Sequence, residues 1–132
     1  TSLPSTPGPF PDLSINSLES WEVYTHGGRK ATGIDAVKWA RYMESLGAGE
    51  LLLTSMDKDG TKTGYDIPLT SLISSQASIP VIASGGAGTI GHISDVLQCC
   101  DAALLASMLH YKETTVEEIK EACHTQGIPI RL

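Results

Sequence analysis

The chain has 132 residues, of which 41% are hydrophobic and 18% are charged, and its formal net charge is −6. This composition is typical of a soluble globular domain with its own core. The acidic balance argues against nucleic-acid or anionic membrane partners, and no apolar stretch approaches the roughly 20 residues that span a bilayer. The odd number of cysteines, which is a poor disulfide framework, is consistent with a reducing cytoplasm, so we expect a cytoplasmic protein. A phosphorylated ligand stays possible, because backbone N–H groups can hold phosphate without bulk positive charge.

The sulfur and imidazole side chains do not indicate a metal centre. The three cysteines, Cys99, Cys100 and Cys123, suit neither a disulfide framework nor a zinc site. We expect them to be buried or partly buried thiols in helices. The four histidines are scattered, without an H-E-x-x-H grouping, so the sequence predicts no metal site.

The first twenty residues, Thr1 to Ser20, hold four of the seven prolines. Proline lacks an N–H group and fixes φ, so such a stretch continues neither a helix nor a central strand. We expect an irregular leader over residues 1–20, with a short strand around Leu13–Ile15 as the alternative.

The pattern becomes regular from Trp21 onward. Trp21–Thr25 alternates and is rich in β-formers, which predicts a strand that extends or pairs with another. Gly27 to Lys30 then predicts a loop. Apolar residues recur at helical spacing from Gly33 to Leu46, with Gly47 as a stop.

Strands and helices then alternate to the end of the chain. Glu50–Met56 is a continuous apolar run, typical of a strand covered on both faces in a parallel sheet. The later elements are expected as a helix at Ile67–Ala77, a strand at Ile79–Ser84, a turn at Gly85–Gly88, a helix at Ile90–Cys100, a strand at Ala102–Ser107 and a helix at Val116–Gln126. This alternation predicts an α/β fold with a parallel sheet.

Polar residues and glycines collect where the predicted strands end. They are Thr54, Ser55, Asp57, Asp59 and Gly60 after the first, Ser84, Gly85, Gly86 and Gly88 after the second, and Ala106 and Ser107 at the third. Ligands of parallel α/β folds bind at the carboxyl ends of the strands. Glycine lets successive N–H groups converge on an anion, so we expect a phosphate site. The alternative is that these glycines only make tight turns.

Asp57 and Asp59 are candidates for acid–base chemistry or for orienting a substrate by hydrogen bonding. Asp59 is the stronger candidate for the site. Their alternative role is to cap a turn, because aspartate before glycine is a common turn element.

Four motifs carry a resemblance to a known family: Tyr24–Lys30 (YTHGGRK), Gly47–Asp66 (GAGELLLTSMDKDGTKTGYD), Ile79–Gly88 (IPVIASGGAG) and Gly127–Leu132 (GIPIRL). In this order they resemble the cyclase subunit of imidazole glycerol phosphate synthase, over Trp21 to Leu132. The sister isomerase of the same pathway shares the DGT and S/A-G-G elements. THGGRK and ASGGAG favour the cyclase.

The resemblance implies the C-terminal half of a (βα)8 barrel, a TIM barrel, over residues 21–132. It implies a lyase of histidine biosynthesis that converts a phosphoribosyl-formimino aminoimidazole carboxamide ribotide and ammonia to imidazole glycerol phosphate and aminoimidazole carboxamide ribotide. A glutaminase subunit would supply the ammonia, and no metal or organic cofactor would take part. By motif, the substrate- or phosphate-binding residues would be Thr54, Gly60, Ser84, Gly85, Gly86, Ala106 and Ser107, with Asp59 supporting the reacting region.

One departure bears on catalysis. The family's two catalytic carboxylates lie on the first and fifth strands, and the first has no counterpart in this sequence. The fifth strand usually reads SIDA, whereas this chain has SINS at Ser14–Ser17, so Asn16 occupies the position of the acid. An amide does not exchange a proton near neutral pH, so acid–base catalysis there should fail. An unrelated leader is the alternative.

A barrel usually needs about 250 residues, so we expect this chain to pair with an N-terminal half-barrel or to self-associate. The isolated chain should be incomplete or inactive as a cyclase. Two alternatives stay open: a catalytically dead phosphate-binding half-barrel, and the sister isomerase.

Overall fold

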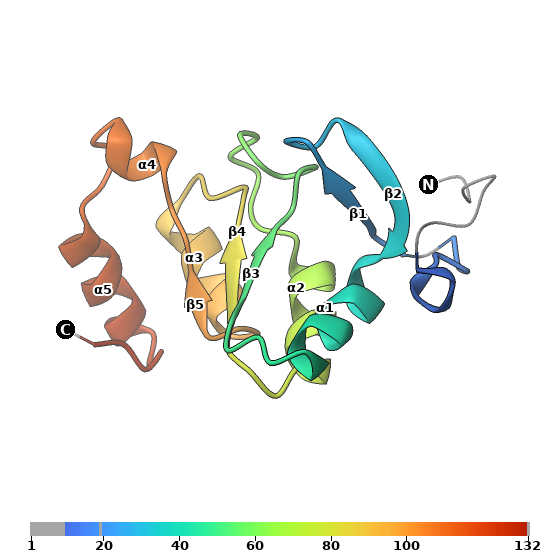
Figure 1. Ribbon diagram of the computed structural model, residues 1–132. Helices are drawn as coiled ribbons and strands as arrows, with labels where there is room; N and C mark the ends of the chain where they lie inside the picture. The colour runs from blue at the N-terminus through green and yellow to red at the C-terminus, as the bar shows by residue number, and fades with distance from the viewer. Residues whose placement is uncertain (1–9, 19, 132) are drawn as a thin grey trace. The chain divides into compact units, whose positions relative to one another are not determined.

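The computed structural model describes residues 10–18 and 20–131. Their contacts divide into two compact units, one ending at Gly49 and the other beginning at Glu50. The elements labelled in Figure 1 are the strands β1 (Glu22–Thr25), β2 (Lys30–Asp35), β3 (Leu51–Thr54), β4 (Val81–Ser84) and β5 (Ala102–Ala103), and the helices α1 (Ala36–Ser45), α2 (Ile67–Gln76), α3 (Ile90–Leu97), α4 (Ser107–His110) and α5 (Val116–Thr125). No helix among the described residues is long and apolar enough to cross a membrane. The predicted division into residues 1–20 and 21–132 stays a prediction, and residues 1–9 and 19 lie outside the described part.

The first unit contains an antiparallel hairpin of β1 and β2 followed by α1. The strand at Trp21–Thr25 is confirmed as β1. The helix predicted from Gly33 was wrong at its start, because β2 continues to Asp35 and α1 begins at Ala36. The Asp35 carboxylate accepts hydrogen bonds from the N–H groups of Val37 (2.9 Å) and Lys38 (3.0 Å) and so caps the helix at this point.

The described part of the leader packs against the hairpin. A 3₁₀ turn spans Pro11–Leu13, and the strand considered for Leu13–Ile15 is reduced to one antiparallel bridge between Ser14 and Ile34. The Ile15 N–H donates to the Gly33 carbonyl oxygen at 3.0 Å, and the Ile15 residue is 8% exposed. The segment therefore contributes an apolar side chain to the core of its unit.

The second unit is built on a parallel sheet in the order β3-β4-β5, and the three strands run side by side in Figure 1. The chain passes through α2 between β3 and β4 and through α3 between β4 and β5. The predicted α/β arrangement of parallel strands alternating with helices is confirmed.

The two faces of this sheet differ in burial. Val81 and Ala83 are 0% and 1% exposed, and Ala83 belongs to the core cluster that also holds Ile93 and Val96 of α3. Leu52 pairs in register with Ile82, so its side chain lies on the opposite face, where it is 59% exposed. The expectation that the run Glu50–Met56 is covered on both faces was wrong, because the helices bury one face only.

Two further boundaries differ from the prediction. The strand expected at Ala102–Ser107 ends at Ala103, and Ser107 is the first residue of α4. Helix α3 ends at Leu97, so Cys99 and Cys100 lie after it, half-buried, and not in a helix as predicted. Cys123 is fully buried in α5, in agreement with the prediction.

Candidate functional site

A small pocket lies at the carboxyl ends of the parallel strands, where the loops after β3, β4 and β5 meet. It is lined by Asp59, Gly60, Lys62, Ser84, Gly85, Gly86, Ala87, Leu104, Leu105, Ala106 and Ser107. Its volume of about 50 Å³ is several times the ~10–15 Å³ that holds one water molecule. A group of a few heavy atoms therefore fits.

The loop after β4 approaches the neighbouring loop so closely that only glycine fits. Gly85 and Gly86 have φ values of +91° and +107°. A Cβ atom on Gly85 would lie 2.7 Å from the Ser55 carbonyl oxygen, and one on Gly86 would run into the carbonyl oxygen of Gly64. The glycines predicted from the ASGGAG motif thus meet a steric requirement of the backbone.

Hydrogen bonds hold the long loop after β3 against β4. The Ser55 N–H donates to the Ser84 carbonyl oxygen at 3.1 Å. The Gly64 N–H donates to the Gly86 carbonyl oxygen at 2.8 Å. The loop ends at Asp66, whose carboxylate accepts from the Leu69 N–H at 3.1 Å and so caps α2. Asp59 and Gly60 lie on a loop that is fixed at both ends.

Tyr65 joins this loop to the segment after β5. Its hydroxyl donates a hydrogen bond to the Leu104 carbonyl oxygen at 2.9 Å. The Leu104 N–H in turn donates to the Ala83 carbonyl oxygen at 2.8 Å. The Tyr65 residue is 4% exposed, and burial, with a smaller contribution from Cys100, raises its pKa to about 12. The phenol therefore stays neutral and keeps its hydrogen bond across the physiological range.

Charge at the pocket is sparse. Among the residues that line it, Lys62 alone carries a positively charged side chain and Asp59 alone a negatively charged one. The Lys62 ammonium pairs with the Glu113 carboxylate at 2.5 Å and lies 5.8 Å from the centre of the Tyr111 ring. Glycine-rich loops of this kind can present backbone N–H groups to a small anion without charged side chains.

The structure brings together most of the site residues predicted from the sequence. Those that line the pocket are Asp59, Gly60, Ser84, Gly85, Gly86, Ala106 and Ser107. Asp57 is not among the lining residues, and neither is Thr54. Thr54 pairs in register with Ser84, so both side chains lie on the open face of the sheet.

Asn16 belongs to the first unit, where it is exposed, two residues beyond the bridge of Ser14 with Ile34. Sequence reasoning missed Lys62 as a pocket residue, although it follows Gly60 by two positions in the DGTKTG motif that carried the resemblance. In the described part of the chain, no cluster of three or more His, Cys, Asp or Glu side chains is placed to hold a metal ion.

Comparisons with a family model and with curated proteins both find relatives of this chain. Residues 11–115 match the family model described as "Histidine biosynthesis protein". The chain is also similar to the imidazole glycerol phosphate synthase subunit HisF of Thermococcus gammatolerans, with 61% identity over 113 residues. That alignment covers 85% of this chain and 45% of the relative, so the chain spans about half the length of the curated relative that it matches.

Proposed function

We propose a function from one premise: this chain belongs to the histidine biosynthesis protein family, a family of TIM barrels. In that setting it supplies the C-terminal, phosphate-binding half of the cyclase of imidazole glycerol phosphate synthase. The pocket at the ends of β3, β4 and β5 is the observation that carries this proposal, because three separate loops converge there on a space of phosphoryl size.

Phosphate binding follows from the chemistry of the lining. Gly60, Gly85 and Gly86 have no side chain to keep a phosphoryl oxygen away from the main chain, so their N–H groups are accessible to it. Each charge-assisted hydrogen bond from such a group contributes about 1.5–3 kcal/mol. Ala106 and Ser107 close the pocket on the β5 side.

The rest of the substrate extends from this pocket along the open face of the sheet. Ser84 lines the pocket and Thr54 lies beside it in register, which supports a role for both hydroxyls in contacting the ribotide between its ends. Asp59, at the pocket, supports the reacting region by accepting hydrogen bonds from the substrate. The substrate is the phosphoribosyl-formimino aminoimidazole carboxamide ribotide that the resemblance implies.

Turnover needs groups beyond this pocket. The family's acid on the fifth strand is replaced by Asn16, and the aspartate of the first strand has no match in these 132 residues. Cyclisation therefore requires the complementary N-terminal half of the barrel, and a glutaminase subunit supplies the ammonia.

An activity assay tests the proposal. The chain is mixed with an N-terminal half-barrel from a related cyclase, and substrate and ammonium are added. The expected products are imidazole glycerol phosphate and aminoimidazole carboxamide ribotide, formed by the mixture at a rate that the missing fifth-strand acid keeps low, and by neither half alone. An isomerised ribotide as the product would instead identify the sister isomerase.

One observation favours a second candidate, a phosphate-binding half-barrel without catalytic activity. Asn16 has no proton to exchange near neutral pH where the family has an acid. If the mixed halves bind inorganic phosphate and the ribotide but release neither product, the second candidate holds.

A further inference from the structure

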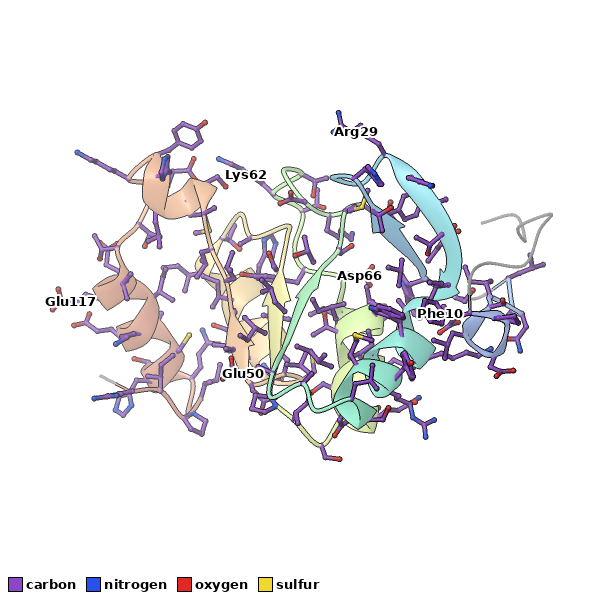
Figure 2. The ribbon with its side chains drawn as sticks, in the orientation of Figure 1. Phe10, Arg29, Glu50, Lys62, Asp66 and Glu117 are labelled. Carbon is purple, nitrogen blue, oxygen red and sulfur yellow. The ribbon has the colours of Figure 1, made fainter. Side chains whose placement is uncertain are left out.

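The ion pair of Lys62 and Glu113 lies where the loop after β3 meets the segment after α4. Figure 2 shows Lys62 extending from its loop, and its ammonium lies 2.5 Å from the Glu113 carboxylate. The two side chains are 43% and 39% exposed, so water reaches both. Exposed pairs of this kind contribute little to folding stability, which makes a purely structural role a weak explanation for the pair.

The backbone holds Lys62 at the pocket, whereas its ammonium is free to change partner. Lys62 has a φ of +56°, a backbone conformation that residues other than glycine rarely adopt. Its carbonyl oxygen packs so tightly against Gly88 that a Cβ there would collide with it, and its neighbour Thr63 forms a hydrogen bond to the side chain of Thr61. The main chain of Lys62 is therefore fixed, and only its flexible side chain can move.

Charge gives that side chain two competing partners. A bound phosphoryl dianion would sit in a pocket that also contains the Asp59 carboxylate, and Lys62 is the only lining residue with a side chain to offset the two. A dianion attracts an ammonium more strongly than the single charge of Glu113 does at a similar distance. On this comparison Glu113 would hold the ammonium near the pocket and release it to a bound phosphoryl group.

We propose that Lys62 is the mobile cation of the phosphate pocket, held in reserve by Glu113 and transferred to the phosphoryl group on binding. This inference rests on the proposed phosphate site and adds a specificity residue to it. Selectivity for doubly charged phosphate over its monoanion would come from Lys62, because neutral backbone donors distinguish the two forms less strongly.

The test is a calorimetric titration of the whole chain with inorganic phosphate at pH 8 and at pH 5.5. Lys62→Met should weaken binding about tenfold at pH 8 and reduce the preference for pH 8. Lys62→Arg should restore binding to within about threefold, because it keeps the charge. Glu113→Gln should tighten binding about threefold, because it removes the competing carboxylate. Lys112→Met is the matched control, since it removes one exposed lysine beside Glu113 that does not line the pocket.

The outcomes separate the inference from the function on which it rests. If the wild type binds phosphate and Lys62→Met binds it equally well, the role of Lys62 is overturned and the pocket stands. If Glu113→Gln weakens binding as Lys62→Met does, the pair is a structural link and the proposed transfer is wrong. If the wild type, folded by circular dichroism, binds no phosphate at either pH, the pocket and this inference both fail.

Discussion

The N–H group of Gly64 donates a 2.8 Å hydrogen bond to the carbonyl oxygen of Gly86 and so joins two of the three loops that form the pocket. This contact leaves no space for a side chain on Gly86, whose φ is +107°. The geometry of the proposed phosphate site therefore depends in part on a backbone contact between two residues that are 22 positions apart in the sequence.

Gly86→Ala should separate the two loops. The added Cβ would collide with the Gly64 carbonyl oxygen, so we expect phosphate affinity to fall at least about tenfold, with a destabilisation of about 1–3 kcal/mol. Isothermal calorimetry with inorganic phosphate and urea unfolding measure the two effects.

Gly127→Ala is the control, because Gly127 has a similar positive φ of +76° with open space around its Cβ position. It should cost about 1 kcal/mol and leave binding unchanged. Equal losses of affinity in both variants would contradict the steric explanation.

Tyr65→Phe should lower the stability of the protein at neutral pH and remove one cause of its loss of stability at alkaline pH. The folded state raises the Tyr65 pKa to about 12, against 10.0 in the unfolded chain. Above pH 10 the unfolded chain therefore loses its proton first, and the stability that this neutral phenol provides falls as pH rises from about 10 to 12. At neutral pH the variant should lose about 0.5–1.5 kcal/mol with the hydrogen bond to Leu104.

Urea unfolding at pH 8 to pH 11 checks this dependence. The stability difference between wild type and Tyr65→Phe should shrink above pH 10. Tyr111→Phe removes a hydroxyl from a residue that is 73% exposed and should behave as wild type does. A constant difference between wild type and Tyr65→Phe would contradict the raised pKa.

Asn16→Asp should restore the missing acid when the N-terminal half-barrel is present. Asn16 is exposed, so the new carboxylate carries little burial cost and stability should stay within about 0.5 kcal/mol. General acid–base catalysis typically contributes 10²–10⁴-fold, so we expect turnover of the mixture to rise by about 100-fold or more. Release of imidazole glycerol phosphate is the measurement, with Asn16→Ala as the control. No increase in a mixture that binds the substrate would show that Asn16 does not occupy the position of the acid.

Leu52→Glu should reduce self-association. Leu52 is 59% exposed on the open face of the parallel sheet, Leu104 directly after β5 is 41% exposed, and β3 and β5 are the edges of that sheet. Such surfaces favour pairing with another copy or with a complementary half. Sedimentation velocity should show a dissociation constant at least about tenfold weaker for Leu52→Glu. Leu46→Glu changes a leucine that is 65% exposed in the other unit and should have no effect. A wild-type chain that stays monomeric at every concentration tested would contradict this prediction.

The sequence predicted the second unit better than the first. The runs at Glu50–Met56 and Ile79–Ser84 are local signals of strands, and the glycines between Gly85 and Gly88 mark a turn that the backbone contacts require. The start of α1 was misplaced because Gly33 and Ile34 fit a helical pattern equally well. Both residues lie in β2, where Ile34 bridges to Ser14 and the Gly33 carbonyl oxygen accepts from the Ile15 N–H, and periodicity does not report such tertiary pairing.

The part of the site that could be predicted from the sequence is the part made of glycines, because a glycine at a strand end has a specific structural role. Glycines at strand ends indicate close approach of the backbone, and three of them, Gly60, Gly85 and Gly86, line the pocket. Lys62 was not predictable in this way, because a lysine in an exposed loop is usually solvated. Its significance arises from its ion pair with Glu113, which lies 51 residues away in the sequence and is visible only in the structure.

The central claim is that backbone amides of the three loops converge on a phosphoryl group. A titration of the ¹⁵N-labelled chain with ribose 5-phosphate, followed by amide resonances, tests it most directly. The resonances of Gly60, Gly86 and Ser107 should shift together along one saturable curve, while that of Gly127 stays in place. A folded sample in which these three resonances do not move would contradict the account.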